Sequence, residues 1–376
     1  MEFLYEGLLS VTWQQAVMYG VGGLLIWLAI QKQYEPALLL PMGFGAILVN
    51  LPMSGVIDQV TQGVGETHGI IQWLFESGIE VSEAFPLLLF IGIGAMIDFG
   101  PLLVNPKLFL FGAAAQVGIF LTIIAAAAFG FDIIDAASIG IIGAADGPTS
   151  ILVSQVLGSK YVGAIAVAAY SYMALVPIIQ PFAIKLVTTK KERAMKMPYA
   201  AGKVSRRTRI LFPIVVSIVA GLVAPASVSL VGFLMFGNLI RECGVLESLS
   251  KTAQHELANL ITLLLGITIA ARMQAEAFLN PQTLLILALG LIAFIFDTAG
   301  GVIFAKFLNL FLKKKINPMI GASGISAFPM SARVVHKMGL AEDKQNFLLM
   351  HSIGVNVSGQ IASVIAGGLI LNLIAR

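Results

Sequence analysis

Apolar stretches long enough to cross a lipid bilayer recur along this chain from one end to the other. A membrane-spanning helix needs about 20 mostly apolar residues. Because a backbone surrounded by lipid must satisfy its own hydrogen bonds, such stretches are expected to be helices. The sequence therefore predicts an all-α polytopic membrane protein with about ten transmembrane helices. The expected spans are residues 13–31, 35–52, 84–104, 107–130, 161–186, 208–225, 228–243, 255–272, 282–311 and 345–372.

Composition narrows the possible function classes. Only 11% of the 376 residues are charged, against about 25% in soluble proteins. The single cysteine, Cys243, excludes an internal disulfide, and the histidines lack metal-ligand spacing, so we expect no transition-metal site. The chain has no Gly-x-x-x-x-Gly-Lys-Ser/Thr motif, so it is not expected to be an ATPase. We expect no nucleic-acid partner. The acidic N-terminus lacks a basic region, so no cleaved signal peptide is predicted.

Two polar segments rich in Gly, Ala and Pro interrupt the apolar pattern. They are Gly143-Ala-Ala-Asp-Gly-Pro-Thr-Ser150 and Gly321-Ala-Ser-Gly-Ile-Ser-Ala-Phe-Pro-Met-Ser-Ala-Arg333. Both begin Gly-Ala, and they occupy corresponding places in the two halves of the chain. Interrupted segments at matching positions are the best sequence pointer to a transporter binding site. We therefore predict two re-entrant helical hairpins, residues 135–157 and 318–338.

The two halves have a similar order of elements, each with four helices, a broken segment and a further helix. An Asn-Pro pair precedes each broken segment, at Asn105-Pro106 and at Asn280-Pro281. The predicted organisation is an N-terminal half, a basic cytoplasmic connection and a C-terminal half, at residues 1–187, 188–209 and 210–376.

Loop charge predicts how the halves are oriented. Basic loops favour the cytoplasmic side. With both broken segments as hairpins, the 188–209 connection and Lys313-Lys-Lys315 lie inside, while the acidic 53–83 connection lies outside. The halves then form an inverted repeat, with hairpin tips that meet near the midplane. Within residues 53–83 we expect an interfacial helix near Ile70–Phe75.

The first broken segment carries Asp146 beside Gly147-Pro148, followed by Thr149 and Ser150. Carboxylate, hydroxyl and freed carbonyl oxygens suit a small cation or a transferred proton. Ionisable groups inside membranes are usually functional. The alternative is that Asp146 only caps a helix, because Asp-Gly-Pro is also common in turns.

The second broken segment offers an amide, two hydroxyls, a cation and two glycines that allow close backbone approach. Arg333 can hold a carboxylate in a two-pronged contact, or it can be a cytoplasmic-edge arginine that follows the loop-charge rule. The candidate residues are Asn317, Gly321, Ser323, Gly324, Ser326 and Arg333.

Further polar residues lie within apolar surroundings. Tyr172 and Asn356 follow the two broken segments at similar places, so we expect them to share a polar cavity or, alternatively, to form interhelical hydrogen bonds. Asp98 is expected to cap a helix end. Asp297 lies deeper, with Lys306 or Arg272 as possible partners. Direct ion contact by either aspartate stays open.

Four motifs in order then resemble a known family. They are Met96-Ile-Asp-Phe-Gly-Pro-Leu-Leu-Val-Asn-Pro-Lys107, Gly143-Ala-Ala-Asp-Gly-Pro-Thr149, Gly324-Ile-Ser-Ala-Phe-Pro-Met-Ser-Ala-Arg333 and Asn346-Phe-Leu-Leu-Met-His351. Together they closely resemble the β subunit of the biotin-dependent, sodium-pumping decarboxylases. That family includes the oxaloacetate, methylmalonyl-CoA, glutaconyl-CoA and malonate enzymes, and the resemblance covers nearly the whole chain.

The resemblance implies a function and a set of roles. The β subunit would decarboxylate carboxybiotin on a carrier subunit, consume a proton and export sodium across the bacterial cytoplasmic membrane. Implied partners are the biotin carrier, a carboxyltransferase α subunit and a small membrane γ or δ subunit, with a homo-oligomer possible within the complex. The implied roles are sodium binding and proton exchange by Asp146, proton relay by Ser326 with Tyr172, carboxybiotin binding by Arg333, and shaping of the ion site by Asn317 and Gly321. We expect Ser323 and Asn356, from their positions, to be further sodium-binding residues.

One departure and two alternatives accompany this resemblance. The family pattern Gly-Pro-Asn-Val reads Gly354-Val-Asn-Val357 here, which leaves the bend near Asn356 open. The first alternative is a sodium-coupled secondary transporter, either an organic-anion symporter or a sodium/proton antiporter. The second is a membrane scaffold subunit. The length of the chain is closer to the CoA-ester enzymes, so a methylmalonyl-CoA or glutaconyl-CoA decarboxylase complex is expected.

Overall fold

The computed structural model describes residues 3–61, 65–198 and 202–374, and nearly all of its regular structure is helical. By length and composition, six helices in these residues are able to cross a membrane. A bent pair, Ile70–Glu80 with Ala84–Met96, is a seventh candidate if its 64° bend lies within one span. This confirms the all-α membrane class, while the count of ten spans and the inverted repeat remain predictions. The six spans are Trp13–Lys32, Pro106–Ala128, Val162–Val187, Glu247–Arg272, Pro281–Phe311 and Leu349–Ile374.

The helices of the N-terminal half are mostly short and broken. In chain order they are α1 (Phe3–Leu9), α2 (Trp13–Lys32), α3 (Pro36–Val49), α4 (Ile70–Phe75), η1 (Glu76–Glu80), α5 (Ala84–Met96), α6 (Gly100–Val104), η2 (Pro106–Leu108), α7 (Phe109–Ala115), α8 (Val117–Ala128), α9 (Ile133–Gly140), η3 (Ile141–Ala144), α10 (Gly147–Val156), α11 (Val162–Val187) and α12 (Lys190–Arg193).

The C-terminal half contains the longest helix, α18. Its elements are α13 (Arg206–Val223), η4 (Pro225–Ser227), α14 (Val228–Glu242), α15 (Glu247–Thr252), η5 (Ala253–Leu257), α16 (Ala258–Ile269), η6 (Ala270–Arg272), α17 (Ala275–Phe278), α18 (Pro281–Phe311), η7 (Pro318–Gly324), α19 (Met330–Glu342) and α20 (Leu349–Ile374).

A small β-hairpin is an exception that the sequence analysis did not predict. Strands β1 (Asp58–Thr61) and β2 (Gly65–His68) pair antiparallel, with Asp58 opposite His68. These residues are too polar for a membrane span, and their backbone groups pair with each other instead. The helix expected at Ile70–Phe75 directly follows as α4.

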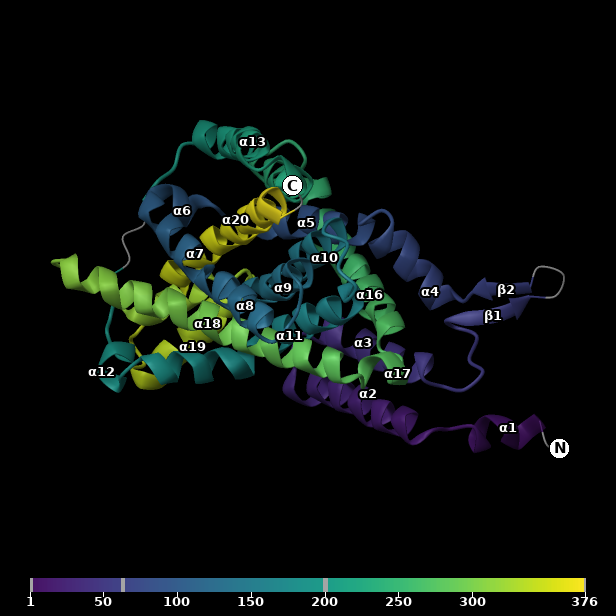
Figure 1. Cartoon of the computed structure of the whole chain (residues 1–376). Coiled ribbons are helices and arrows are strands. Elements are labelled where there is room, and N and C mark those ends of the chain that lie inside the picture. The colour runs from purple at the N-terminus through teal and green to yellow at the C-terminus, as the bar shows by residue number, and fades with distance from the viewer. Residues whose placement is uncertain (1–2, 62–64, 199–201, 375–376) are drawn as a thin grey trace.

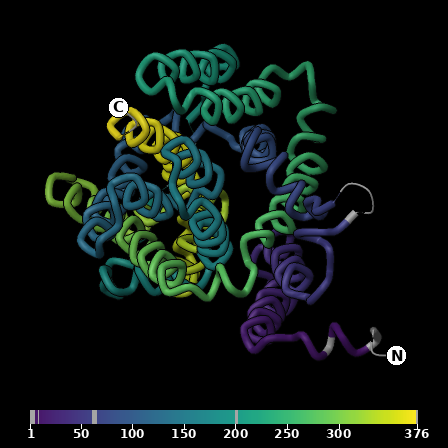
Figure 2. The backbone as a smooth tube through the Cα atoms, turned by 45° about the vertical axis from the view of Figure 1, so that its right-hand side comes forward, coloured from purple at the N-terminus to yellow at the C-terminus, as the bar shows by residue number. Residues whose placement is uncertain are grey.

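Two helices cross the bundle and organise it (Figure 1). The long α18 packs against α11, α8, η3 and η7, while α20 packs against α7, η7, α19 and α10. Asn280 starts α18 by accepting the Gln282 N–H at 2.9 Å, with Pro281 in the first turn, where its missing N–H costs nothing. Figure 2 shows α2, α3 and α16 side by side, away from α18 and α20. A separate apolar core fills each group.

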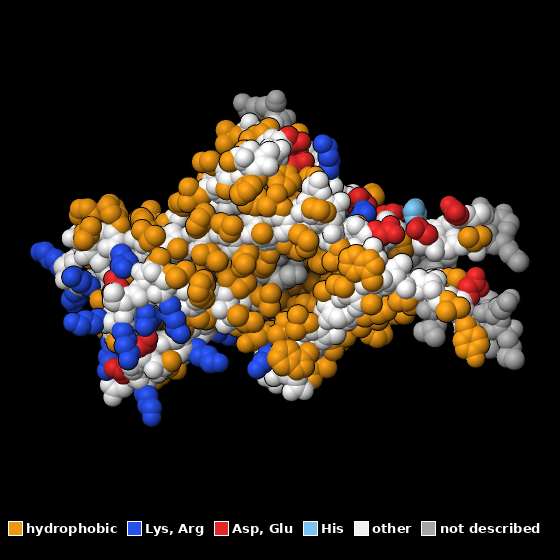
Figure 3. Space-filling view, turned by 60° about the horizontal axis from the view of Figure 1, so that its bottom comes forward, with side chains coloured by type: hydrophobic (Ala, Val, Ile, Leu, Met, Phe, Trp, Pro, Cys, Tyr) orange, Lys and Arg blue, Asp and Glu red, His pale blue; other side chains and the backbone are white. Residues whose placement is uncertain are grey.

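Charge is distributed unevenly over the surface. On the face in Figure 3, Lys and Arg side chains gather at one end, Asp and Glu side chains gather at the end with the β-hairpin, and hydrophobic side chains cover the middle. Ion pairs place the basic connection beside the second broken segment, since Arg193 pairs with Glu342 at 2.6 Å and Lys196 with Asp343 at 3.0 Å. The orientation of the two halves relative to a membrane remains a prediction from loop charge.

Candidate ion site at the two helix breaks

The first broken segment is a helix, a break and a second helix, as predicted. The chain leaves η3 through Ala145, whose φ of 53° is left-handed, and α10 begins at Gly147. Asp146 lies between them, and its Oδ1 accepts the Thr149 N–H at 3.2 Å. Asp146 is therefore the N-cap of α10, as the capping interpretation predicts.

Capping uses only one oxygen of the Asp146 carboxylate. The other, Oδ2, accepts the Ser363 hydroxyl of α20 at 2.9 Å. Asp146 is 4% exposed, and no Lys or Arg in the described ranges forms an ion pair with it. A buried carboxylate without a positive partner is costly unless it binds a cation or a proton. The geometry thus supports a cation site in addition to a cap.

The second broken segment passes from η7 to α19 through residues 325–329. A methyl group on Gly321 would lie 2.0 Å from the Gly301 carbonyl oxygen of α18, so only glycine permits this contact. Gly324 also lies close to α7, where the added methyl group would lie 2.7 Å from the Phe111 carbonyl oxygen. These contacts confirm the predicted close backbone approach and bury the start of the break against two helices.

The two breaks touch each other. The Ser326 N–H of the second break donates to the Ala144 carbonyl of the first at 2.9 Å. The Ser326 hydroxyl donates to the Gly359 carbonyl of α20 at 3.1 Å, and the Gln360 side chain donates to the Ser326 carbonyl. Segments far apart in the sequence therefore meet at one polar centre, in agreement with the expected contact between their tips.

Side chains of α20 form hydrogen bonds with both breaks. Asn356 Nδ2 donates to the Ile325 carbonyl at 2.7 Å and to the Ser323 carbonyl at 3.2 Å, and two turns later Ser363 contacts Asp146. Asn356 Oδ1 and the Ser323 hydroxyl are buried without a hydrogen-bond partner. Such oxygens are rare in native proteins, and an unseen water or ion is a common reason for them.

Distance separates some of the predicted ion ligands. Asn356 and Ser363 are seven residues apart, which is about 10 Å along a helix axis. No hydrogen bond joins Asp146 to Asn356 in the described residues. Asn317 caps η7 and donates to the Arg193 and Met195 carbonyls at 2.9 and 2.8 Å. Its amide therefore links the basic connection to the start of η7.

Tyr172 and Arg333 lie away from this centre. The Tyr172 hydroxyl donates to the Leu287 carbonyl of α18 and forms no hydrogen bond with Ser326. Arg333 is exposed on α19. Burial raises the pKa of the Glu35 carboxyl, in the loop between α2 and α3, and the Arg333 charge partly offsets that rise.

The remaining membrane aspartates have different surroundings. Asp98 accepts the Gly100 N–H at 2.8 Å and pairs with Arg209 at 3.4 Å, but the N-cap of α6 is Phe99, so the expected cap by Asp98 is wrong. The expected partners of Asp297 are wrong. Lys306 instead pairs with Glu192 at 3.0 Å, and Arg272 pairs with Glu80 at 3.2 Å, because partly exposed carboxylates reach both bases whereas Asp297 is buried.

The sequence analysis missed three residues of the centre. Ser363 and Gln360 lie on α20, and the Tyr170 ring fills the space where a methyl group on Gly147 would stand. A signal for the first two was present, because Asn356, Gln360 and Ser363 recur at helical spacing. Tyr170 had no such signal, since two tyrosines of α11 were equally eligible.

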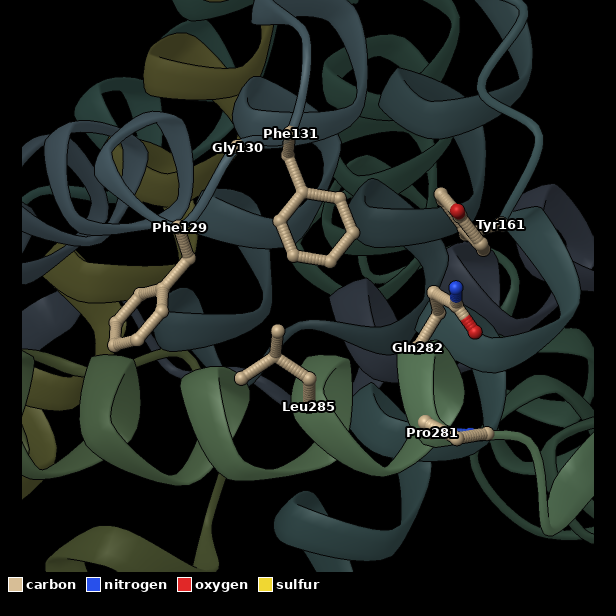
Figure 4. A pocket seen from close by; sticks show the side chains of 7 residues that line it. All are labelled: Phe129, Gly130, Phe131, Tyr161, Pro281, Gln282 and Leu285. Carbon is tan, nitrogen blue, oxygen red and sulfur yellow. The ribbon is translucent and has the colours of Figure 1, made fainter.

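Two surface cavities lie outside this centre. Phe129, Phe131, Tyr161 and Leu285 line a cavity of about 400 Å³ between the end of α8 and the start of α18 (Figure 4). A cavity of about 520 Å³ shares Tyr161 and Gln282 with it and includes the Glu80 and Arg272 pair. Asp146 lines neither of these two cavities.

These features define a polytopic helical membrane protein with a buried carboxylate where two broken helices meet, a construction suited to ion translocation. Comparison with known proteins then gives the family. The Na+-transporting oxaloacetate decarboxylase beta subunits match residues 14–374, and the chain belongs to this family, which confirms the resemblance.

Relatives with different substrates are similarly close. The chain is 48% identical to the methylmalonyl-CoA decarboxylase subunit beta of Propionigenium modestum, over 95% of this chain and 94% of the relative. It is 47% identical to the glutaconyl-CoA decarboxylase subunit beta of Acidaminococcus fermentans, over 98% and 96%. It is 43% identical to the oxaloacetate decarboxylase beta chain of Haemophilus ducreyi, over 98% and 97%.

Proposed function

We propose that this chain is the membrane subunit that decarboxylates carboxybiotin on a carrier subunit, consumes a proton and couples the reaction to sodium export across the bacterial cytoplasmic membrane. The observation that carries the proposal is Asp146, a buried carboxylate with no basic partner, held between two broken helices. Family membership favours this function over a secondary transporter. Biotin would arrive on the carrier, and the carboxyltransferase and small membrane subunits would complete the complex.

The roles follow from position. Asp146 binds sodium and exchanges it for a proton, with Ser363 as a neighbouring oxygen. Ser323 and Asn356 supply the unpartnered oxygens of the second break, while Gly321 and Asn317 hold that break in shape. Ser326 relays the proton, since its backbone bridges both breaks. Tyr172 joins this relay only if its bond to α18 opens. Arg333, exposed on α19 beside the basic connection, receives the anionic carboxybiotin.

A CoA ester is the proposed substrate class of the whole complex. Alignment with the methylmalonyl-CoA and glutaconyl-CoA relatives spans 374 and 369 residues, close to the length of this chain. Alignment with the Haemophilus ducreyi oxaloacetate relative spans 423, so that protein has additional residues without counterparts here. Decarboxylation assays of the purified complex with methylmalonyl-CoA, glutaconyl-CoA and oxaloacetate test this assignment, and turnover of oxaloacetate alone would reject it.

The central test replaces Asp146. Asp146→Asn keeps the shape but removes the charge that neutralises sodium and the group that exchanges a proton. We expect loss of sodium-dependent decarboxylation and of sodium uptake into inside-out vesicles, with normal assembly in the membrane. The matched control is Asp132→Asn, a cap at the start of the same hairpin. Near-normal sodium transport by Asp146→Asn would show that Asp146 is only a cap.

A further inference from the structure

A second carboxylate, Asp297, is buried beside the same break and has no part in the roles above. It is 0% exposed and lies in α18, which runs past α8 and α9 (Figure 1). Its Oδ1 accepts the Ile119 N–H at 3.1 Å, just after the chain breaks between α7 and α8 at Gln116. These contacts fix the orientation of the carboxylate.

The other oxygen, Oδ2, has no hydrogen-bond partner. It faces the first break, since a methyl group on Gly143 would lie 2.4 Å from it. Gly143 is three residues before Asp146, so the two aspartates border one break from different helices. Asp146 faces α20, and Asp297 approaches from α18. An unpartnered, fully buried oxygen aimed at a helix break is therefore the distinguishing feature of Asp297.

No positive side chain neutralises Asp297 among the described residues. The elements packed against this part of α18 are η7, α11, α8, η3, α7 and α9. Asp135 of α9 accepts a hydrogen bond from the Ser159 hydroxyl at 2.7 Å, and Lys306 of α18 forms an ion pair with Glu192. The remaining titratable groups on these elements are Tyr170, Tyr172 and Lys185, and Asp146 follows η3.

The surroundings of Oδ2 decide which cation fits. Sodium needs several oxygen ligands at once, as other hard cations do. The atoms that share the space at Gly143 with Oδ2 belong to Ala293, its methyl group among them. Oδ2 is a single carboxylate oxygen without a hydrogen-bond partner, and no second oxygen is among these nearest atoms, so it fits a proton. We propose that Asp297 is a second cation-binding site whose occupant is a proton, distinct from the sodium site at Asp146.

This inference rests on the proposed function only for the use of that proton. A neutral Asp297 removes a like charge from the vicinity of Asp146, where low polarity makes such repulsion strong. A proton stored there is also available to the break when carboxybiotin is decarboxylated. The existence of the site itself can be tested without turnover.

The experiment is infrared spectroscopy of the purified complex in ordinary and heavy water. A protonated carboxylic acid has a carbonyl-stretch band separate from those of carboxylates, and the band shifts on deuteration. We expect this band in the wild type, its loss in Asp297→Asn, and its retention in Asp146→Asn. Sodium should still protect Asp297→Asn against proteolysis at wild-type concentrations, since asparagine resembles the protonated acid in shape and charge.

Several results would overturn the proposal. These are the absence of the band from the wild type, an unchanged band in Asp297→Asn, and removal of the wild-type band by sodium. If Asp297→Asn does not fold, Asp146→Asn still decides, because loss of the band there would place the proton on Asp146. Retained sodium protection in Asp146→Asn would instead reject the proposed function and leave the Asp297 assignment standing.

Discussion

Arg333 is the positive side chain of the second broken segment, and it is exposed on α19, which packs against α12 of the basic connection. Loss of a charge-assisted contact to a carboxylate costs roughly 1.5–3 kcal/mol, or about ten- to a hundredfold in affinity. We expect Arg333→Ala to raise the carboxybiotin concentration needed for half-maximal activity by that factor. Arg333→Lys should rescue poorly, because an ammonium lacks the planar geometry.

Sodium protection against proteolysis should persist in both Arg333 variants. Loss of that protection with unchanged use of carboxybiotin would contradict the proposed division of roles between Arg333 and Asp146.

Glu35, whose pKa responds to the charge of Arg333, allows a test of how protein stability depends on pH. Its pKa is raised by burial, so the folded state binds a proton more tightly than the unfolded state. The free energy of unfolding therefore falls as pH rises from the ordinary carboxyl range through the raised pKa. Glu35→Gln should raise the melting temperature above this window and leave it unchanged at lower pH. The exposed Glu66→Gln serves as control, and equal shifts in both variants would contradict the assignment.

Tyr170 and Tyr172 can be separated experimentally. The Tyr170 ring lies against Gly147, next to Asp146, whereas the Tyr172 hydroxyl contacts α18. We expect Tyr170→Phe to change the sodium concentration for half-maximal activity. Tyr172→Phe should mainly lower stability, by about 1 kcal/mol. Sodium titration and thermal unfolding of both variants check this, and the opposite pattern would favour Tyr172 as the relay residue.

At the scale of elements, the breaks were predictable because their causes are local. Gly147-Pro148 and the glycines of the second segment determine backbone geometry wherever they occur. The partners of these breaks were less predictable, since Ser363 reaches Asp146 across 217 positions of sequence. The β-hairpin was missed because four-residue strands have almost no periodic signal.

Hydrogen bonds and an ion pair join the basic connection to the second broken segment and to the end of α19. The Arg193 carbonyl accepts from Asn317 and from Asn346, each at 2.9 Å, while its side chain pairs with Glu342. This pair is 13% and 15% exposed, so solvent screens it less than a surface pair. We expect Arg193→Ala to destabilise the protein by about 1.5–3 kcal/mol.

A double-mutant cycle with Glu342→Ala should give a coupling energy for this pair, measured by thermal unfolding. Lys251→Ala with Glu247→Ala, an exposed pair, is the matched control and should give little coupling. If the effects of Arg193→Ala and Glu342→Ala on the free energy of unfolding were additive, the ion pair would not stabilise this junction.

For the molecule as a whole, the orientation of the halves is the main untested prediction. Lys160, after the first hairpin, and Lys344, after the second, are both exposed. In a Cys243→Ala background, Lys160→Cys should react with an impermeant thiol reagent from outside, and Lys344→Cys only from the cytoplasm. Reaction of both from the same side would reject the inverted repeat.

The single helix α20 touches both breaks, and this has a mechanical consequence. Ser363 and Asn356 cannot move independently, because a rigid helix joins them. Any sliding or rotation of α20 that breaks the hydrogen bond to the Asp146 carboxylate also changes the hydrogen bonds from Asn356 to the Ser323 and Ile325 carbonyls. Ion release on one side and rearrangement on the other would then be a single correlated motion. Gly359 is its contact point, since an added methyl group would lie 2.2 Å from the Gly324 carbonyl oxygen and displace the helix from both partners together.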